Sequence, residues 1–180
     1  VISVVNHRYD DYGNEIVNHS EGDPDDPDDD VVVWSDYYYN TGDWIIGKIK
    51  RERVSHSFQI DGSPSAIVPS YTPPESEEAY LRSTSYYYDQ AYGSAPTETA
   101  PVHGNLTHVV RKCGYQYYTV TAAFDDYGNQ TDFWDAKGHR SHTDYDQTSH
   151  AFPVRSYDAL GFAASPQYCT EVLDLDCQDG

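Results

Sequence analysis

The densest group of side chains that could do chemistry is an acidic loop over Gly22–Asp30, which reads GDPDDPDDD. Clustered carboxylates on an extended loop supply the oxygen ligands that calcium prefers, and Asp26, Asp28 and Asp30 are the candidate ligands. The residue order of an EF-hand is missing, because neither a central glycine nor a distal glutamate stands at the required spacing. A solvated acidic loop is therefore the favoured interpretation. Calcium is kept as the alternative, and no other cofactor is expected.

Residue patterns typical of enzymes are missing from the rest of the sequence. It contains no Gly-x-Ser-x-Gly and no HExxH. His139 and His142 are three residues apart, which would place them on opposite faces of a strand, and His56 and His150 have no motif partner. With 30 acidic residues, a pair of nearby carboxylates carries no weight as a glycosidase site. We therefore expect a protein that is not an enzyme, with no catalytic residues.

Three cysteines leave at least one thiol unpaired. Cys169 and Cys177 enclose a short loop and could form a disulfide in an oxidising compartment, although the sequence leaves this open. Cys113 precedes a strand-like run and is expected to be a small buried residue. Three glycosylation sequons, whose use also stays open, begin at Asn18, Asn105 and Asn129.

A repeated hexapeptide predicts the elements that position these groups. YDDYGN at Tyr9–Asn14 recurs as FDDYGN at Phe124–Asn129. Each copy joins an aromatic residue suited to a half-buried strand, an Asp that bonds nearby backbone, and a Gly and an Asn that tolerate positive φ. The unit therefore predicts a strand end followed by a tight turn. Turn-setting and stacking roles are assigned to Tyr9, Asp10, Gly13, Asn14, Phe124, Asp125, Gly128, Asn129, Tyr157, Asp158 and Gly161.

Weaker copies of the unit predict further turns along the chain. They are Tyr88-Asp89 with Tyr92-Gly93, Tyr145-Asp146, Tyr157-Asp158 with Gly161, and the stretch Asp135–Gly138. Alternating and β-rich runs predict strands at Val31–Tyr39, Trp44–Val54 and Tyr80–Tyr88, and one long strand or a hairpin at Val109–Phe124. Ser63–Glu78 is rich in Pro and Ser and predicts a surface insertion.

No window sustains the apolar spacing of a helix, so the predicted fold is all-β and antiparallel, built from β-hairpin repeats over residues 1–180. Leu, Ile, Val and Phe number only 32, and the net charge is −19, values that are typical of disorder. Eighteen Tyr and three Trp argue against disorder, because each aromatic side chain buries a large area and keeps a polar tip. We expect a thin sheet held together by aromatic packing, with little aliphatic interior.

The excess of acid limits the partners. Binding to phosphate groups depends on Lys and Arg, which total only 11, so neither nucleic acid nor an anionic membrane is expected as a partner. No apolar run approaches the ~20 residues of a membrane-spanning helix, so membrane insertion is not expected either. The charge favours solubility, and it also fits a marine or high-salt environment, where salt screens the repulsion.

The order of these motifs resembles the Rhs/YD-repeat family, whose unit is Tyr-Asp, two or three residues, then Gly-Asn or Gly-Arg. The resemblance begins at Arg8–Ile16, continues through Tyr37–Ser55 and His103–Arg111, and covers the clearest repeats at Phe124–Gly161. It implies a long sheet that spirals into a hollow shell. The aspartyl self-cleavage motif of some members, Asp-Pro-x-Gly, is not matched, because Ala159 stands where proline should be.

The resemblance implies a structural segment, internal to a longer secreted or cell-surface protein, that encloses or displays a polypeptide such as a toxin. Its partners would be the remainder of the same polypeptide and the enclosed or attached chain. Two alternatives stay open. One is an adhesion or glycan-binding module that uses exposed aromatic residues such as Trp34, Trp44 and Trp134. The other is a fibre subunit that assembles through its edge strands.

Overall fold

The computed structural model describes residues 4–23, 29–56, 59–61 and 70–165, in which strands and turns occur and α-helix does not. Every strand pair is antiparallel, so the prediction of an all-β antiparallel fold is confirmed. The chain divides into two compact units, Val1–Thr119 and Val120–Gly180. Two of the calcium candidates, Asp26 and Asp28, lie outside the described residues, as do Cys169, Cys177 and residues 63–69 of the predicted insertion.

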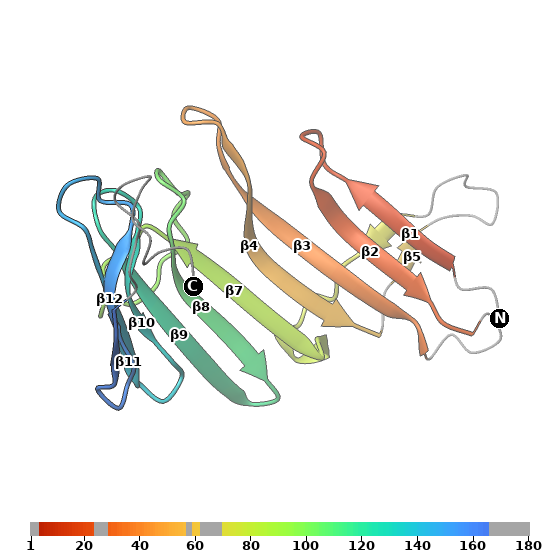
Figure 1. Cartoon of the computed structure of the whole chain (residues 1–180). Helices are drawn as coiled ribbons and strands as arrows, with labels where there is room; N and C mark the ends of the chain where they lie inside the picture. The colour runs from red at the N-terminus through yellow and green to blue at the C-terminus, as the bar shows by residue number, and fades with distance from the viewer. Residues whose placement is uncertain (1–3, 24–28, 57–58, 62–69, 166–180) are drawn as a thin grey trace, which may run out of the picture. The chain divides into compact units, whose positions relative to one another are not determined.

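Unit 1 is an antiparallel meander (Figure 1). Its strands lie in the order β1-β2-β3-β4-β7-β8, with bounds Val4–Tyr9, Glu15–Glu21, Val31–Asn40, Ile45–Ser55, Arg82–Tyr88 and Leu106–Cys113. The short strands β5 (Gln59–Asp61) and β6 (Ser70–Thr72) pair only with each other, and a single 3₁₀ turn, η2 (Glu77–Ala79), precedes β7. Because the strands of this meander pair antiparallel in chain order, with only the β5–β6 pair set aside between β4 and β7, alternate connections lie at the same end of the unit.

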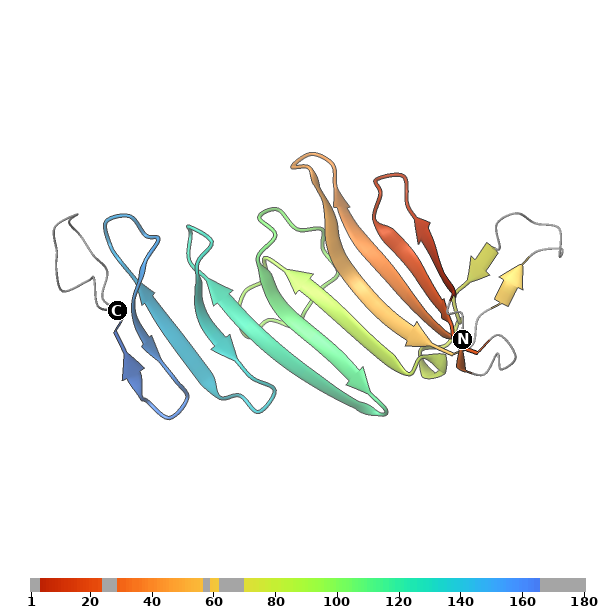
Figure 2. The same cartoon turned by 45° about the vertical axis from the view of Figure 1, so that its right-hand side comes forward.

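Unit 2 continues the same local pattern with shorter strands (Figure 2). The strands follow in the order β9-β10-β11-β12-β13, with bounds Gln116–Phe124, Gln130–Trp134, Arg140–Tyr145, Pro153–Tyr157 and Ala163–Ala164. The division between the units falls within β9. The predicted strand or hairpin at 109–124 is a hairpin, because Gly114 adopts a φ of +59° between β8 and β9.

Two strand predictions need correction. Trp44 does not begin a strand, because it lies in the β3–β4 turn with a positive φ of 57°, and β4 begins at Ile45. The strand predicted over Tyr80–Tyr88 begins only at Arg82, since the chain before it forms η2. In both cases a residue with strong β propensity lies outside a strand, because local propensity yields to tertiary context.

A small core lies on one face of unit 1. Val32 and Trp34 project from the same face of β3, and Val17 of β2 stands opposite Trp34. Tyr80 completes the cluster, and the Trp34 indole donates a hydrogen bond to Ser55 Oγ at 3.0 Å. Trp34 is only 4% exposed, so it packs in the core, and the alternative in which it stacks on sugar rings does not apply to it. The interior of unit 1 therefore does contain an aliphatic contribution, from the two valines.

Two runs of three tyrosines, Tyr37–Tyr39 in β3 and Tyr86–Tyr88 in β7, place side chains on both faces of the sheet, as strand alternation requires. Tyr38 and Tyr88 are buried and meet edge to face, with ring centroids 5.9 Å apart. Their hydroxyls donate to backbone carbonyls, that of Tyr38 to Tyr86 and that of Tyr88 to Ile49. Burial raises the pKa of the Tyr88 phenol to about 12. The neighbouring Tyr39 is exposed, whereas Tyr86 and Tyr87 are half-buried.

Cys113 is exposed, and the expectation that it is buried is wrong. It ends β8 directly before the turn at Gly114, where no strand or loop of the described chain covers it. A residue at the end of a strand is covered by fewer neighbouring side chains than a residue in the middle of the strand. In the part of the chain that the structure describes, no helix is long and apolar enough to cross a membrane.

Candidate functional site

The first hexapeptide folds into a turn closed by its aspartate. The Asp10 N–H donates to Asn14 O at 2.9 Å, and the Gly13 N–H donates to Asp10 O at 3.1 Å. The Asp10 carboxylate also accepts the N–H groups of Tyr12 (2.9 Å) and Asn14 (2.8 Å). Gly13 has a φ of +86°, a conformation that side-chain-bearing residues rarely adopt. The aspartate thus satisfies the backbone groups that the tight turn leaves unpaired.

The second hexapeptide repeats this geometry. The Asp125 N–H donates to Asn129 O at 3.0 Å, and the Gly128 N–H donates to Asp125 O at 3.1 Å. The Asp125 carboxylate accepts the N–H groups of Tyr127 and Asn129 at 3.0 and 2.9 Å. Gly128 has a φ of +85°. The two sequence copies therefore have one backbone shape and one hydrogen-bond pattern.

Two weaker copies form the same turn. Asp135 and Asp158 each bond the backbone of the residue four positions later, and each is followed by a glycine with φ of +82° or +84°. His139 and Phe162 stand where the hexapeptides have asparagine. The turn therefore needs the aspartate and the glycine, and the asparagine must have another role.

Two further copies are expanded. The Asp89 N–H donates to Asn105 O, and its carboxylate accepts four successive backbone N–H groups from Val102 to Asn105. Asp89 and Asn105 are 16 residues apart, against 4 in the tight form. The predicted turn at Gly93 is present, with a φ of +78°, but the Asp89 carboxylate closes the longer turn, in which Gly104, with a φ of +84°, takes the glycine position. Gly93 is closer to Asp89 in the sequence, but the Asp89 carboxylate bonds the backbone at Gly104, which lies beyond the loop.

Asp146 closes the other expanded turn. Its N–H donates to Phe152 O, and its carboxylate accepts the N–H groups of Ser149, Ala151 and Phe152. The position of positive φ is occupied by His150, at 54°, instead of glycine. These hydrogen bonds to the ionised form lower the pKa of the Asp146 carboxyl.

The asparagine of each hexapeptide reaches the following hairpin. Asn14 Nδ2 donates to Asp10 Oδ2 and to the backbone carbonyl of Ile46 in β4, each at 2.8 Å. Asn129 Nδ2 likewise donates to Asp125 Oδ2 and to the carbonyl of His150, in the β11–β12 connection. One side chain therefore fixes the turn and links it to the next hairpin. The sequon that begins at Asn129 has its amide nitrogen committed to these two bonds.

The second tyrosine of each hexapeptide also contacts the following hairpin. Tyr12 lies against Tyr39 with ring centroids 5.4 Å apart, and Tyr127 stacks on His150 at 4.0 Å. From the sequence, stacking was expected at Tyr9, and the role of Tyr12 and Tyr127 was not predicted. The signal was present, since the hexapeptide repeats this tyrosine as faithfully as it repeats the glycine.

The turn aspartates are held in the charged form. Burial opposes ionisation of Asp10, but hydrogen bonds from Tyr39, Asn14 and Tyr12 outweigh it and lower the pKa of the carboxyl to about 2. A hydrogen bond from the Asn129 side chain is the largest cause that lowers the pKa of Asp125. The backbone N–H of His139 does the same for Asp135. The acidity follows from the turn, because only the carboxylate accepts all these donors.

Asp30, the described member of the calcium candidates, already has protein partners. Its Oδ2 lies 3.0 Å from Nε2 of the buried His19, and its Oδ1 accepts the Gly22 N–H at 3.3 Å. Within the described ranges, no group of three or more His, Cys, Asp or Glu side chains could hold a metal ion. Asp30 therefore has a visible role in joining β2 to the start of β3.

The histidines of unit 2 lie beside carboxylates or an aromatic ring. His142 bridges two carboxylates, with Nδ1 2.8 Å from Asp132 and Nε2 3.0 Å from Asp144. Burial opposes protonation of His142, but these two carboxylates outweigh it and raise the pKa of the imidazole. His139 lies beside Asp135 in its turn. Of the remaining tryptophans, Trp44 is 71% exposed, and Trp134 lies beneath the Arg140 guanidinium.

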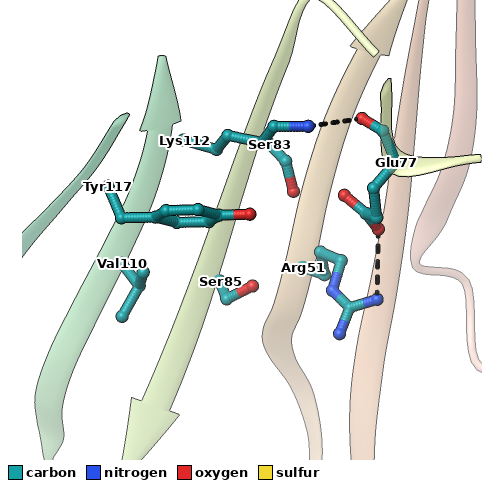
Figure 3. A pocket seen from close by; sticks show the side chains of 7 residues that line it. All are labelled: Arg51, Glu77, Ser83, Ser85, Val110, Lys112 and Tyr117. Atoms are coloured by element: carbon teal, nitrogen blue, oxygen red, sulfur yellow. Dashed lines mark hydrogen bonds and ion pairs between the residues drawn. The ribbon is translucent and has the colours of Figure 1, made fainter. Parts of the chain in front are cut away.

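A polar cavity of about 250 Å³ opens on unit 1 (Figure 3). The middle strand β7 supplies the small residues Ser83 and Ser85 to the cavity, while the flanking strands supply the long side chains of Arg51 and Lys112. Arg51 of β4 stands opposite Ser85, and Lys112 of β8 stands opposite Ser83. The full lining consists of Arg51, Glu77, Ser83, Ser85, Val110, Lys112 and Tyr117.

Comparison with protein-family models and with curated proteins found no match to this chain.

Proposed function

We propose that this chain is a structural, non-enzymatic segment of a YD-repeat wall that encloses or displays a polypeptide cargo such as a toxin. The main support is that both hexapeptides make the same kinds of contact with the hairpin that follows them. In both, asparagine bonds the backbone of the following hairpin and tyrosine lies against an aromatic ring from it. A motif that positions its neighbour in the same way each time allows hairpins to be added one after another.

The edge strands support neighbouring repeats as partners. Among the described strands, β1 of unit 1 pairs only with β2, and β13 of unit 2 pairs only with β12. An edge strand presents unpaired backbone N–H and C=O groups, which natural proteins cover or protect. In this proposal the remainder of the same YD-repeat polypeptide pairs with such edges. The parent protein is then secreted or displayed at the cell surface, where enclosing a cargo is useful.

Electron cryomicroscopy of the parent polypeptide tests the wall. The expected result is a hollow shell in which this segment contributes consecutive hairpins to the wall. A protease should degrade the enclosed cargo only after the shell has been opened with denaturant. A solid particle, or a cargo digested as fast as the same cargo in isolation, contradicts the proposal.

Self-assembly into a fibre is the second candidate, because an exposed edge can equally pair with another copy. Val4 and Val5 on β1 are exposed apolar residues of such an edge. Light scattering of this chain over a range of concentrations separates the two candidates. Filaments that grow with concentration favour the fibre, whereas particles of constant mass favour a wall completed by neighbouring repeats.

A further inference from the structure

The cavity of Figure 3 contains hydrogen-bonding groups that the fold does not use. No hydrogen bond joins the side-chain hydroxyls of Ser83, Ser85 or Tyr117 to a residue within the described ranges. Figure 3 shows the Tyr117 hydroxyl pointing across β7 toward the side of the cavity formed by Glu77. Since a hydroxyl both donates and accepts, these three groups suit a ligand that carries hydroxyls of its own.

Two cations border the same space. Lys112 Nζ donates one hydrogen bond, to the backbone carbonyl of Glu77 at 2.7 Å, and an ammonium group has three donors. Arg51 is hydrogen-bonded to Glu98, and its Nη1 lies 3.7 Å from the Glu77 carboxylate, which is beyond hydrogen-bonding distance. The lining therefore carries two positive charges and one negative charge, although the chain as a whole has a net charge of −19.

The remaining lining groups define the rest of the ligand. The Tyr117 ring is 65% exposed and stands beside Val110, so one side of the cavity offers an apolar surface. The Glu77 carboxylate provides acceptors for ligand hydroxyls. The volume of about 250 Å³ lies just below the range of about 300–1,000 Å³ that holds drug-sized ligands, so the ligand is small.

We propose that this cavity binds a single hexuronic acid unit, as a free sugar or at the end of an acidic glycan. The ligand carboxylate would meet Lys112 and Arg51. The ring hydroxyls would bond Ser83, Ser85 and the Glu77 carboxylate, and the apolar face of the ring would lie on Tyr117. This role goes beyond the proposed wall, because it gives one face of the sheet a ligand of its own.

The test is titration of this chain with D-glucuronate, followed by two-dimensional NMR of the backbone amides. We expect dissociation near the millimolar range, about 1 mM, with the largest shifts at Ser83 and Ser85. D-glucose, which lacks the carboxylate, and acetate, which lacks the ring, should each bind about tenfold more weakly. Comparison of glucuronate with a disaccharide ending in glucuronate distinguishes the free sugar from the glycan end.

Variants locate the site. Lys112→Gln should weaken glucuronate binding about tenfold, and Ser85→Val should abolish it by filling the cavity. The matched control is Arg111→Gln, which removes a cation one residue away on the other face of β8 and should leave binding unchanged. Melting curves of each variant exclude unfolding as the cause.

Each contrary result overturns the proposal in a defined way. Equal binding of glucose removes the role of the cations, and equal binding of acetate or a capped aspartate shows an anion site in place of a sugar site. If Arg111→Gln weakens binding as much as Lys112→Gln, the attraction is a general effect of charge. The absence of amide shifts at 50-fold excess over the expected dissociation constant, about 50 mM, rejects the site altogether.

Discussion

The two units use the same turn but differ in what lies between the turns. Unit 1 buries Val17, Val32, Trp34 and Tyr80 as one cluster. Of the residues described in unit 2, only Ala122 is buried. Unit 2 instead carries closely spaced aspartate turns and the ion pairs of His142. The turn motif therefore specifies hairpins, whereas burial determines how strongly they are held.

Trp34→Ala should have the largest effect and should weaken mainly unit 1. Loss of a buried tryptophan costs about 3–5 kcal/mol, and this change also leaves Ser55 without its indole donor. Amide hydrogen exchange, which reports local stability, should show faster exchange throughout β2, β3 and β4. Exchange in β10 to β12 of unit 2 should stay within error. Equal acceleration in both units means that they unfold together.

Gly13→Ala and Gly128→Ala should cost similar amounts although they lie in different units. Both positions have φ near +85°, where a Cβ costs about 1–2 kcal/mol, and a Cβ at Gly13 would meet no atom within 4 Å. Urea unfolding measures both changes. Gly42→Ala is the control, because Gly42 lies in a turn without positive φ. If all three variants lose the same stability, backbone strain is not the cause.

Acid should weaken the turns of both units. A carboxyl with a lowered folded pKa stabilises the fold fully above its unfolded value, about 3.9, and loses that contribution as the pH falls through the folded value. For Asp10 the window extends from pH about 4 down to about 2. Circular dichroism against pH should show unfolding in this window. Asp10→Asn and Asp125→Asn should reduce the pH dependence, and unaltered acid curves in both variants would remove the turns as its source.

The smallest effect should be a dependence of unit 2 on pH near neutrality. The raised pKa of His142 means that its contribution is fully present below the ordinary value of 6.5 and is lost as the pH rises through the folded value. Exchange rates in β10 and β11, corrected for intrinsic chemistry, should therefore rise modestly between pH 6 and 8, by about twofold. His142→Gln should remove this change, whereas the exposed His103 of unit 1 can be replaced without effect. A change that persists in His142→Gln assigns it elsewhere.

The sequence predicted the turns because their chemistry is local. The aspartate, the glycine that adopts the positive φ and the asparagine that closes the turn lie within five residues. The hexapeptide alone therefore specifies the hydrogen bonds of Asp10 and Asp125. The all-β fold followed from the same pattern and from the strand-like runs. The loop that separates Asp89 from Gly104 could not be predicted, because its closure depends on hydrogen bonds across 16 positions.

Burial was predicted less well than turn geometry, because it depends on which segments cover a face. Trp34 is buried because β2 and Tyr80 lie beside it, and nothing next to Trp34 in the sequence indicates either neighbour. Cys113 is exposed for the complementary reason, since it ends its strand. The cavity also escaped prediction, because Ser83, Arg51 and Lys112 become neighbours only through the strand register.

The expanded turn at Asp89 affects which insertions the loop between β7 and β8 can tolerate. The Asp89 carboxylate accepts four successive backbone N–H groups at the end of the loop. The segment between Gln90 and Pro101 can therefore change in length while β7 and β8 keep their register. Doubling the length of a flexible loop costs only about 0.6 kcal/mol. Foreign peptides grafted at this point should therefore be carried without loss of the hairpin, which makes the loop a natural site for diversification.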